Sequence, residues 1–127
     1  MAVRPAKLNR PWTSSAEGAR FSEAYVKVGL IPGDGGTYFL PRLVGTAKAL
    51  ELFWTGDFID AQEALRIGLV NRIYLPERLM PEVYEFAGRL AAGPTVAIRT
   101  VKRAVYRRQL SADRYTSYLG LFHGGPT

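Results

Sequence analysis

The chain has 127 residues, 47% of them hydrophobic and 22% charged, with a net charge of +6. This composition is typical of one globular domain or part of one, and it excludes collagen-like, low-complexity and wholly disordered chains. With no cysteine and one histidine, His123, we expect no disulfide, no metal site and no Ser-His-Asp triad. No apolar run approaches the roughly 20 residues of a membrane helix, and residues 1–12 lack the apolar stretch of a secretory signal, so we expect a cytoplasmic protein without membrane contact.

The basic residues concentrate at the two ends of the chain. Residues 1–20 contain four basic residues and one acidic residue, and residues 95–127 contain six basic residues and one acidic residue. In the segment between these two ends, acidic residues outnumber basic ones. A basic protein raises the possibility of nucleic-acid binding. No known nucleic-acid module surrounds these residues, so we keep a basic helical nucleic-acid binder as an alternative and expect no nucleic acid as partner.

The first half of the chain predicts short elements around a glycine-rich turn. Residues 1–18 show no period and are interpreted as an irregular basic flank, and residues 20–28 predict a short strand. Residues 29–36, GLIPGDGG, predict a tight exposed turn. Residues 37–43 predict a short helix, and residues 46–55 predict an almost wholly buried helix that Gly56 ends.

The second half is predicted to be mainly helical. Asp60 is expected to cap a helix with Glu63 at the capping-box spacing, Gly68 to end that helix, and residues 69–75 to form a strand. Helices follow at residues 77–92, with one apolar stripe, and at residues 95–109. Ser111 is expected to cap a last helix that ends near residue 122. The stripe of the first of these helices consists of Leu79, Val83, Phe86, Ala87 and Leu90, and in the second helix Ile98, Val101, Ala104 and Val105 are expected to face inward.

The residues best suited to acid–base catalysis lie between positions 23 and 36. Glu23, Tyr25 and Asp34 are grouped near the glycine-rich turn, and Asp34 lies at the start of a predicted helix. Free backbone N–H groups and apolar neighbours there would suit a general base. The alternative is that Asp34 caps the helix, and Glu23 is interpreted as a solvated strand residue.

A second candidate is the basic face of the helix predicted at residues 95–109. Arg99, Lys102, Arg103 and Tyr106 recur there at helical spacing. This face could bind an anion, and the alternative is an ordinary solvated helix face.

Residues 19–121 resemble the enoyl-CoA hydratase/isomerase (crotonase) family. The resemblance rests on motifs in a fixed order: Phe21, the turn Gly29-Leu30-Ile31-Pro32-Gly33-Asp34-Gly35-Gly36, Leu40-Pro41-Arg42, Gly45, Thr55-Gly56, residues 61–64, Gly68-Leu69-Val70, Leu79, Pro94 and Lys102. It implies an α/β fold, the crotonase-like ββα superhelix, present in part and followed by an α-rich C-terminal region with short strands. Residues 19–127 are thereby interpreted as the C-terminal part of a crotonase-like domain.

The resemblance also implies chemistry on an acyl-CoA thioester. In the family, two backbone N–H groups stabilise the enolate of the thioester, and both donor-bearing segments precede the counterpart of Phe21. Residues 1–18 contain no such glycine-rich segment. We therefore expect a truncated form with little activity by itself, or alternatively a non-catalytic oligomerisation or regulatory module derived from a crotonase.

The positions of the catalytic carboxylates in the family indicate which residues of this chain belong to the expected site. The second carboxylate of the hydratases falls at Tyr25, and a tyrosine cannot replace it near neutral pH because its ordinary pKa is about 10. Isomerases of the family carry an acid at the position of Gly33, whereas Asp34, one residue later, is similar to the acid of some hydrolytic carbon–carbon-cleaving relatives. The resemblance thus favours an isomerase-like or hydrolase-like enzyme over a simple hydratase, with Asp34 as the catalytic residue.

The remaining expectations concern ligands and assembly. The residues expected to line the substrate pocket are Tyr25, Leu30, Pro32, Gly33 and Tyr38, and Lys102 is expected to contact a CoA phosphate. We expect no cofactor, because coenzyme A enters as part of the substrate. By resemblance the partners are an acyl-CoA of fatty acid metabolism and further copies of the chain, as a trimer or hexamer.

Overall fold

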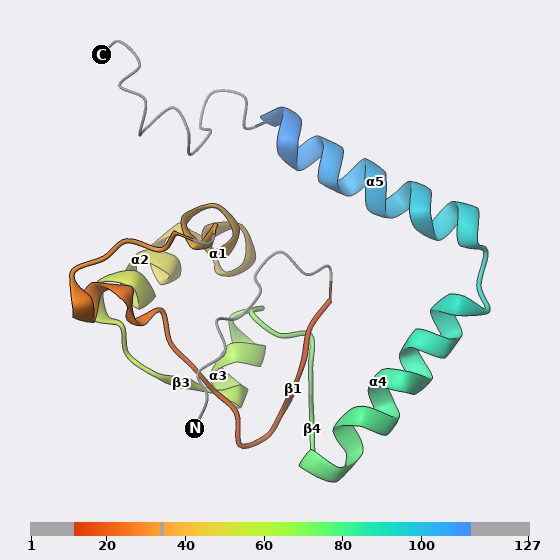
Figure 1. Ribbon diagram of the computed structural model, residues 1–127, viewed down its shortest axis with the longest axis horizontal. Helices are drawn as coiled ribbons and strands as arrows, with labels where there is room; N and C mark the ends of the chain where they lie inside the picture. The colour runs from red at the N-terminus through yellow and green to blue at the C-terminus, as the bar shows by residue number, and fades with distance from the viewer. Residues whose placement is uncertain (1–11, 34, 113–127) are drawn as a thin grey trace. The chain divides into compact units, whose positions relative to one another are not determined.

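The computed structural model describes residues 12–33 and 35–112, with side chains up to residue 106 (Figure 1). The chain divides into two compact units, of which the first ends at Val83 and the second begins at Tyr84. The elements in chain order are β1 (Ser14–Ala16), β2 (Arg20–Phe21), the 3₁₀ helix η1 (Ala24–Val28), α1 (Gly36–Val44), α2 (Thr46–Thr55), β3 (Ile59–Asp60), α3 (Ala61–Arg66), β4 (Arg72–Tyr74), α4 (Pro76–Ala91) and α5 (Thr95–Ala112).

A parallel pair of strands joins the start of the first unit to its end. Ser14 pairs with Arg72 and Ala16 with Tyr74, and the Glu17 N–H donates to the Tyr74 carbonyl at 2.9 Å. The prediction that residues 1–18 are irregular is therefore wrong for residues 14–16. Three residues show no detectable period, and their strand conformation comes from pairing with a segment almost 60 residues away.

The strand predicted at residues 20–28 is also wrong beyond Phe21. Its antiparallel partner β3 has two residues, since Asp60 already caps α3, so β2 has no ladder after the pairs Arg20–Asp60 and Phe21–Ile59. The chain continues as η1, which ends at Gly29 in the left-handed conformation (φ 72°). Hydrogen bonds of this short helix replace those that a longer strand would need from a neighbour.

The core of the first unit lies between α1 and α2. Leu40, Ala49 and Leu52 are buried there, and partly buried apolar side chains of Val44, Phe53, Ile59, Ile67 and Leu69 pack against them. Both helices match the predicted bounds closely, and α2 ends at Gly56 (φ 60°) as expected. The expectation that α2 is almost wholly buried is wrong, because α2 packs through one face and Trp54 is 70% exposed.

Local signals set the connection from α3 to β4. The Glu63 N–H donates to Asp60 Oδ1 at 2.8 Å, which confirms the predicted cap of α3. Gly68 adopts a left-handed conformation after the helix. The next two N–H groups, of Leu69 and Val70, donate to the Ala64 carbonyl, so β4 is shorter than the predicted strand at 69–75.

Two helices account for the rest of the described chain. α4 and α5 match the predicted helices at 77–92 and 95–109, although α5 continues to Ala112 and includes Ser111, which is therefore no N-cap. Ile98 lies against the start of its own helix, where a Cβ on Gly93 would approach its Cδ1 to 3.1 Å. Val101 and Val105, predicted to face inward, are exposed. The last predicted helix lies outside the described residues from position 113 onward.

Candidate functional site

The glycine-rich turn connects η1 to α1, and backbone hydrogen bonds hold its first residues in place. The Gly29 N–H donates to the carbonyls of Tyr25 and Val26, and the Leu30 N–H donates to the Tyr25 carbonyl at 3.0 Å. Pro32 is buried, whereas Leu30 and Gly33 are exposed. Tyr25 therefore anchors the first half of the turn through its backbone.

Glycine at position 35 allows the chain to start α1 directly after the turn. Gly35 is the N-cap residue with φ 91°, and its carbonyl accepts hydrogen bonds from the N–H groups of Tyr38 and Phe39 at 3.0 and 2.9 Å. A Cβ at this position would lie 3.1 Å from the Phe39 ring. A side chain is thus disfavoured by both the backbone angle and the available space.

Tyr38 presents a fixed aromatic ring and a buried hydroxyl at the start of α1. The Arg42 guanidinium lies 3.7 Å from the ring centroid and donates through Nη1 to the Tyr38 carbonyl at 2.6 Å. The Phe39 ring stands edge-on to Tyr38, with 4.8 Å between centroids. Because the hydroxyl oxygen is buried, Tyr38 places a polar group inside the protein close to the turn.

Glu23 is the residue that sequence analysis misjudged. It precedes η1, is half-buried, and has its carboxylate oxygen Oε2 buried, so it is neither a strand residue nor fully solvated. No local signal in the sequence indicates this burial, because the segment is attached through Ser22 to Gly56, 34 residues away. The alternation of polar and apolar residues from Arg20 to Val28 led instead to a solvated strand position.

Asp34, the predicted catalytic residue, lies outside the described residues. The flanking geometry is described on both sides, and the N-cap position of α1 belongs to Gly35, which has no side chain to accept a hydrogen bond. The assignment of Asp34 as base, and of Tyr25, Leu30, Pro32, Gly33 and Tyr38 as pocket residues, remains a prediction.

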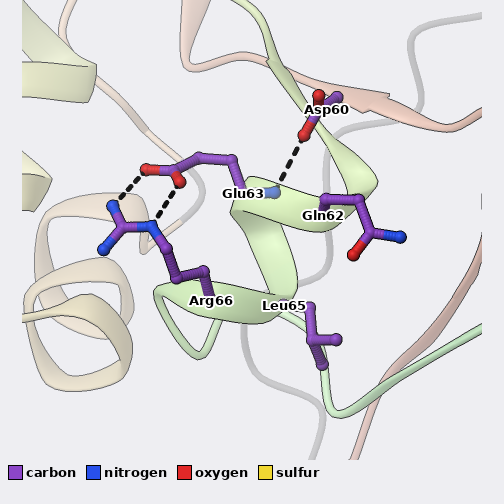
Figure 2. A pocket seen from close by; sticks show the side chains of 5 residues that line it. All are labelled: Asp60, Gln62, Glu63, Leu65 and Arg66. Atoms are coloured by element: carbon purple, nitrogen blue, oxygen red, sulfur yellow. Dashed lines mark hydrogen bonds and ion pairs between the residues drawn. The ribbon is translucent and has the colours of Figure 1, made fainter.

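An open depression of about 530 Å³ lies on α3, separate from the predicted pocket residues (Figure 2). It is lined by Asp60, Gln62, Glu63, Leu65 and Arg66. Glu63 forms ion pairs with Arg66 Nε at 2.6 Å and with Lys48 Nζ at 3.3 Å. Hydrogen bonding from Arg66, and then from Lys48, lowers the pKa of Glu63 from 4.5 to about 2. Its charge is therefore engaged in holding α2 and α3 together.

In the second unit, α5 carries the predicted anion-binding side chains. Lys102 is exposed, as are Arg99 and Arg103, whereas Tyr106 is half-buried. The role of Lys102 toward a CoA phosphate remains a prediction.

Two general features of the described residues bear on the class of site. None of their groupings of histidine, aspartate and glutamate has the three members needed to hold a metal ion. Within the same residues, no helix combines the length and hydropathy required to cross a membrane.

Comparison with known proteins identifies the fold as that of the crotonases. The structure matches the crystal structure of an enoyl-CoA hydratase from Mycobacterium tuberculosis H37Rv with a TM-score of 0.80 and 30% identity, over 84% of this chain and 48% of that chain. A structure from Geobacillus kaustophilus described as an enoyl-CoA hydratase subunit matches with a TM-score of 0.77 and 39% identity, over 90% of this chain and 43% of that one.

Sequence comparison gives the family. The model of the enoyl-CoA hydratase/isomerase family matches residues 13–120, so the chain belongs to this family. A crotonyl-CoA hydratase of Syntrophomonas wolfei is 48% identical over 104 residues, which are 81% of this chain and 40% of that protein. A short-chain-enoyl-CoA hydratase of Clostridioides difficile is 47% identical over 87 residues, 68% of this chain and 56% of that protein. The family match begins at residue 13 and so includes β1.

The chain spans about half the length, or less, of the relatives and solved structures that it matches. The part that the family model matches contains the glycine-rich turn at residues 29–36.

Proposed function

We propose that this chain contributes to proton transfer at the carbon next to the carbonyl of an acyl-CoA thioester. The observation that carries the proposal is the family match at residues 13–120 together with the turn geometry at Gly29, Gly35 and Tyr38. Two relatives of this chain are named crotonyl-CoA hydratase and short-chain-enoyl-CoA hydratase. Removal of an α-proton leaves an enolate, and preorganised N–H donors usually contribute most to stabilising such an anion.

Within this reaction class, we favour an isomerase-like or hydrolase-like reaction, with Asp34 as the base. Tyr25 stands where the family's hydratases carry their second carboxylate, and the ordinary pKa of a tyrosine, about 10, does not suit that role near neutral pH. An aspartate in a turn before a helix can remove a proton when apolar neighbours exclude water. Among the described residues close to Asp34 in sequence are the buried Pro32 and the Tyr38–Phe39 ring pair.

Turnover by the 127-residue polypeptide is expected to be low. Loss of one oxyanion donor typically reduces rates by about 10²- to 10³-fold, and residues 1–18 contain no glycine-rich segment like those that carry the family's donors. An activity far above background would show that other residues, or another copy, supply the donors.

The test follows exchange of the α-proton in D₂O, which detects slow proton transfer by mass. A 3-enoyl-CoA, whose C2 carries acidic protons next to the thioester carbonyl, is incubated with the chain and with Asp34→Asn, which keeps the shape of the side chain and removes the base. We expect exchange to fall by about 10²- to 10⁴-fold, with little change in thermal unfolding. Equal exchange by the chain and by Asp34→Asn would exclude Asp34 as the base.

A second candidate function, a non-catalytic oligomerisation module, is favoured by the exposed apolar residues of α2 and α5, of which Trp54 and Val96 are 70% and 80% exposed. The same exchange assay separates the two candidates, because such a module exchanges no α-proton whether or not it self-associates.

A further inference from the structure

The segment that leads into the glycine-rich turn is attached along its length to the end of α2. Ser22 Oγ donates to the carbonyl of the buried Gly56 at 2.8 Å. Further along the segment, η1 packs against α2. A Cβ on Gly56 would approach both Val26 Cγ1 and Lys27 Cγ to 3.3 Å. One glycine at the end of α2 therefore contacts the segment at two places.

Gly56 could not carry a side chain without displacing η1. A distance of 3.3 Å is shorter than the usual contact of about 3.5–4.0 Å between carbon atoms, so a neighbour would have to move. Lys27 can turn its flexible side chain away. Val26 is branched at Cβ and stiff at χ1, so a push on its Cγ1 passes to the backbone of η1.

The backbone of η1 at this point holds the first residues of the turn. The Val26 carbonyl accepts the Gly29 N–H at 3.1 Å, and the Tyr25 carbonyl accepts the Leu30 N–H at 3.0 Å. The buried Pro32 follows two residues later. The positions of Leu30 and Pro32, two of the predicted pocket residues, thus depend on where η1 rests on the end of α2.

We infer that Gly56 is a positioning residue for the proposed proton transfer, an inference that rests on the proposed function. Because it lacks a side chain, Gly56 lets η1 approach the end of α2, and Val26 carries the position of η1 to the turn. Misplacing a reacting group by about 1 Å can reduce a rate about 10²-fold, so a displacement of a few tenths of an ångström has a measurable effect.

The test compares Gly56→Ala with the matched control Gly68→Ala. Both glycines have positive φ, 60° and 84°, so alanine is expected to destabilise both variants. A Cβ on Gly68 would also meet a close neighbour, the Leu43 carbonyl at 3.2 Å, but it would not meet η1. The control therefore reproduces the strain and the crowding without the push on η1.

Two quantities are measured well below the unfolding temperatures of both variants. NMR follows hydrogen exchange of the Gly29 and Leu30 amides, which needs no substrate. Mass spectrometry follows exchange of the α-proton of a 3-enoyl-CoA in D₂O, at saturating and at limiting substrate. In Gly56→Ala we expect amide protection and the rate at saturating substrate each to fall about tenfold, and in Gly68→Ala both to stay within about twofold.

A second substitution separates the push on η1 from the strain at Gly56. Val26→Ala removes Cγ1 and gives the new Cβ of Gly56→Ala more space, whereas the backbone strain at position 56 stays the same. We expect Gly56→Ala to reduce the rate much less in the Val26→Ala background than in the wild-type chain. An equal reduction in both backgrounds would overturn the inference.

The remaining outcomes distinguish this inference from the proposed function. Unchanged protection of the turn amides in Gly56→Ala would overturn the inference, as would an unchanged rate or an equal loss of rate in Gly68→Ala. In each of these cases exchange by the wild-type chain would still support the proposed function. Absence of α-proton exchange by the wild-type chain would contradict the proposed function and, with it, a role of Gly56 in the reaction.

Discussion

Glu63 is bound by two cations from two helices, and this arrangement makes the first unit sensitive to acid. Arg66 of α3 and Lys48 of α2 hold the pKa of Glu63 at about 2, below its ordinary 4.5. A carboxylate with a lowered pKa in the folded state stabilises the fold above its unfolded-state pKa, and this stabilisation is lost as the pH falls through the folded-state value.

We therefore predict that the urea midpoint of unfolding falls as the pH is lowered from 4.5 to 2. The urea midpoint of the Glu63→Gln variant should fall less over the same interval. The hydrogen bond that Lys48 Nζ donates to Glu51 is the chief cause that raises the pKa of Lys48 above its ordinary 10.5, so Lys48 stays charged throughout this acidic range and its own titration does not produce the slope. Glu77→Gln, which removes an exposed acid at the start of α4, is the matched control and should keep the wild-type slope. Equal slopes for wild type and Glu63→Gln would refute the assignment.

At the scale of single elements, α3 depends on one side-chain cap. Asp60 Oδ1 accepts the Glu63 N–H at 2.8 Å, and α3 has six residues, so a large share of its N–H groups lies in the first turn. We predict that Asp60→Ala destabilises the first unit by about 0.5–2 kcal/mol and that Asp60→Asn, which keeps an acceptor, costs less.

Urea unfolding followed by circular dichroism measures both variants. Asp57→Ala serves as the control, since Asp57 is an exposed acid in the loop just before β3. A loss in Asp57→Ala as large as in Asp60→Ala would indicate a general charge effect instead of a cap.

Elements with local signals could be predicted from the sequence, and those made by distant pairing could not. Gly56 and the Asp60–Glu63 spacing correctly indicate where α2 ends and α3 begins, because a left-handed glycine and a cap act within one helical turn. β1 depends on β4, and η1 replaces a strand because β3 is too short to pair with it. No property of either segment alone carries that information.

The same distinction applies to the candidate site. The glycine at position 35 could be predicted from the turn motif, and its φ of 91° explains the requirement. The burial of Glu23 could not be predicted, since the attachment of its segment runs through Ser22 to Gly56, 34 residues away. Family resemblance identified Tyr25 as a departure from the hydratases, whereas the burial of the Glu23 Oε2 atom, two residues away, is a structural finding.

For the whole molecule, the distribution of apolar surface is the dominant feature. Trp54 of α2 is 70% exposed, and on α5 Val96, Val101 and Val105 are 80%, 63% and 52% exposed. Among the apolar residues singled out in the two helices predicted at 77–92 and 95–109, Leu90 and Val105 are exposed, whereas Phe86 and Ile98 are half-buried. Exposed apolar residues in this number favour contact between chains, because association removes them from water.

We predict that the chain self-associates in solution and that α5 contributes to the contact. Val101 and Val105 lie four residues apart and so share a helix face. Val101→Lys with Val105→Lys should shift the sedimentation coefficient toward the monomer, since two charges cannot be buried in an apolar contact without a large desolvation cost. The matched control Thr100→Lys adds a charge to the same helix on another face and should leave the assembly unchanged. A wild-type chain that sediments as a monomer at every concentration would contradict the prediction, and dissociation by Thr100→Lys alone would point to charge repulsion instead of the valine face.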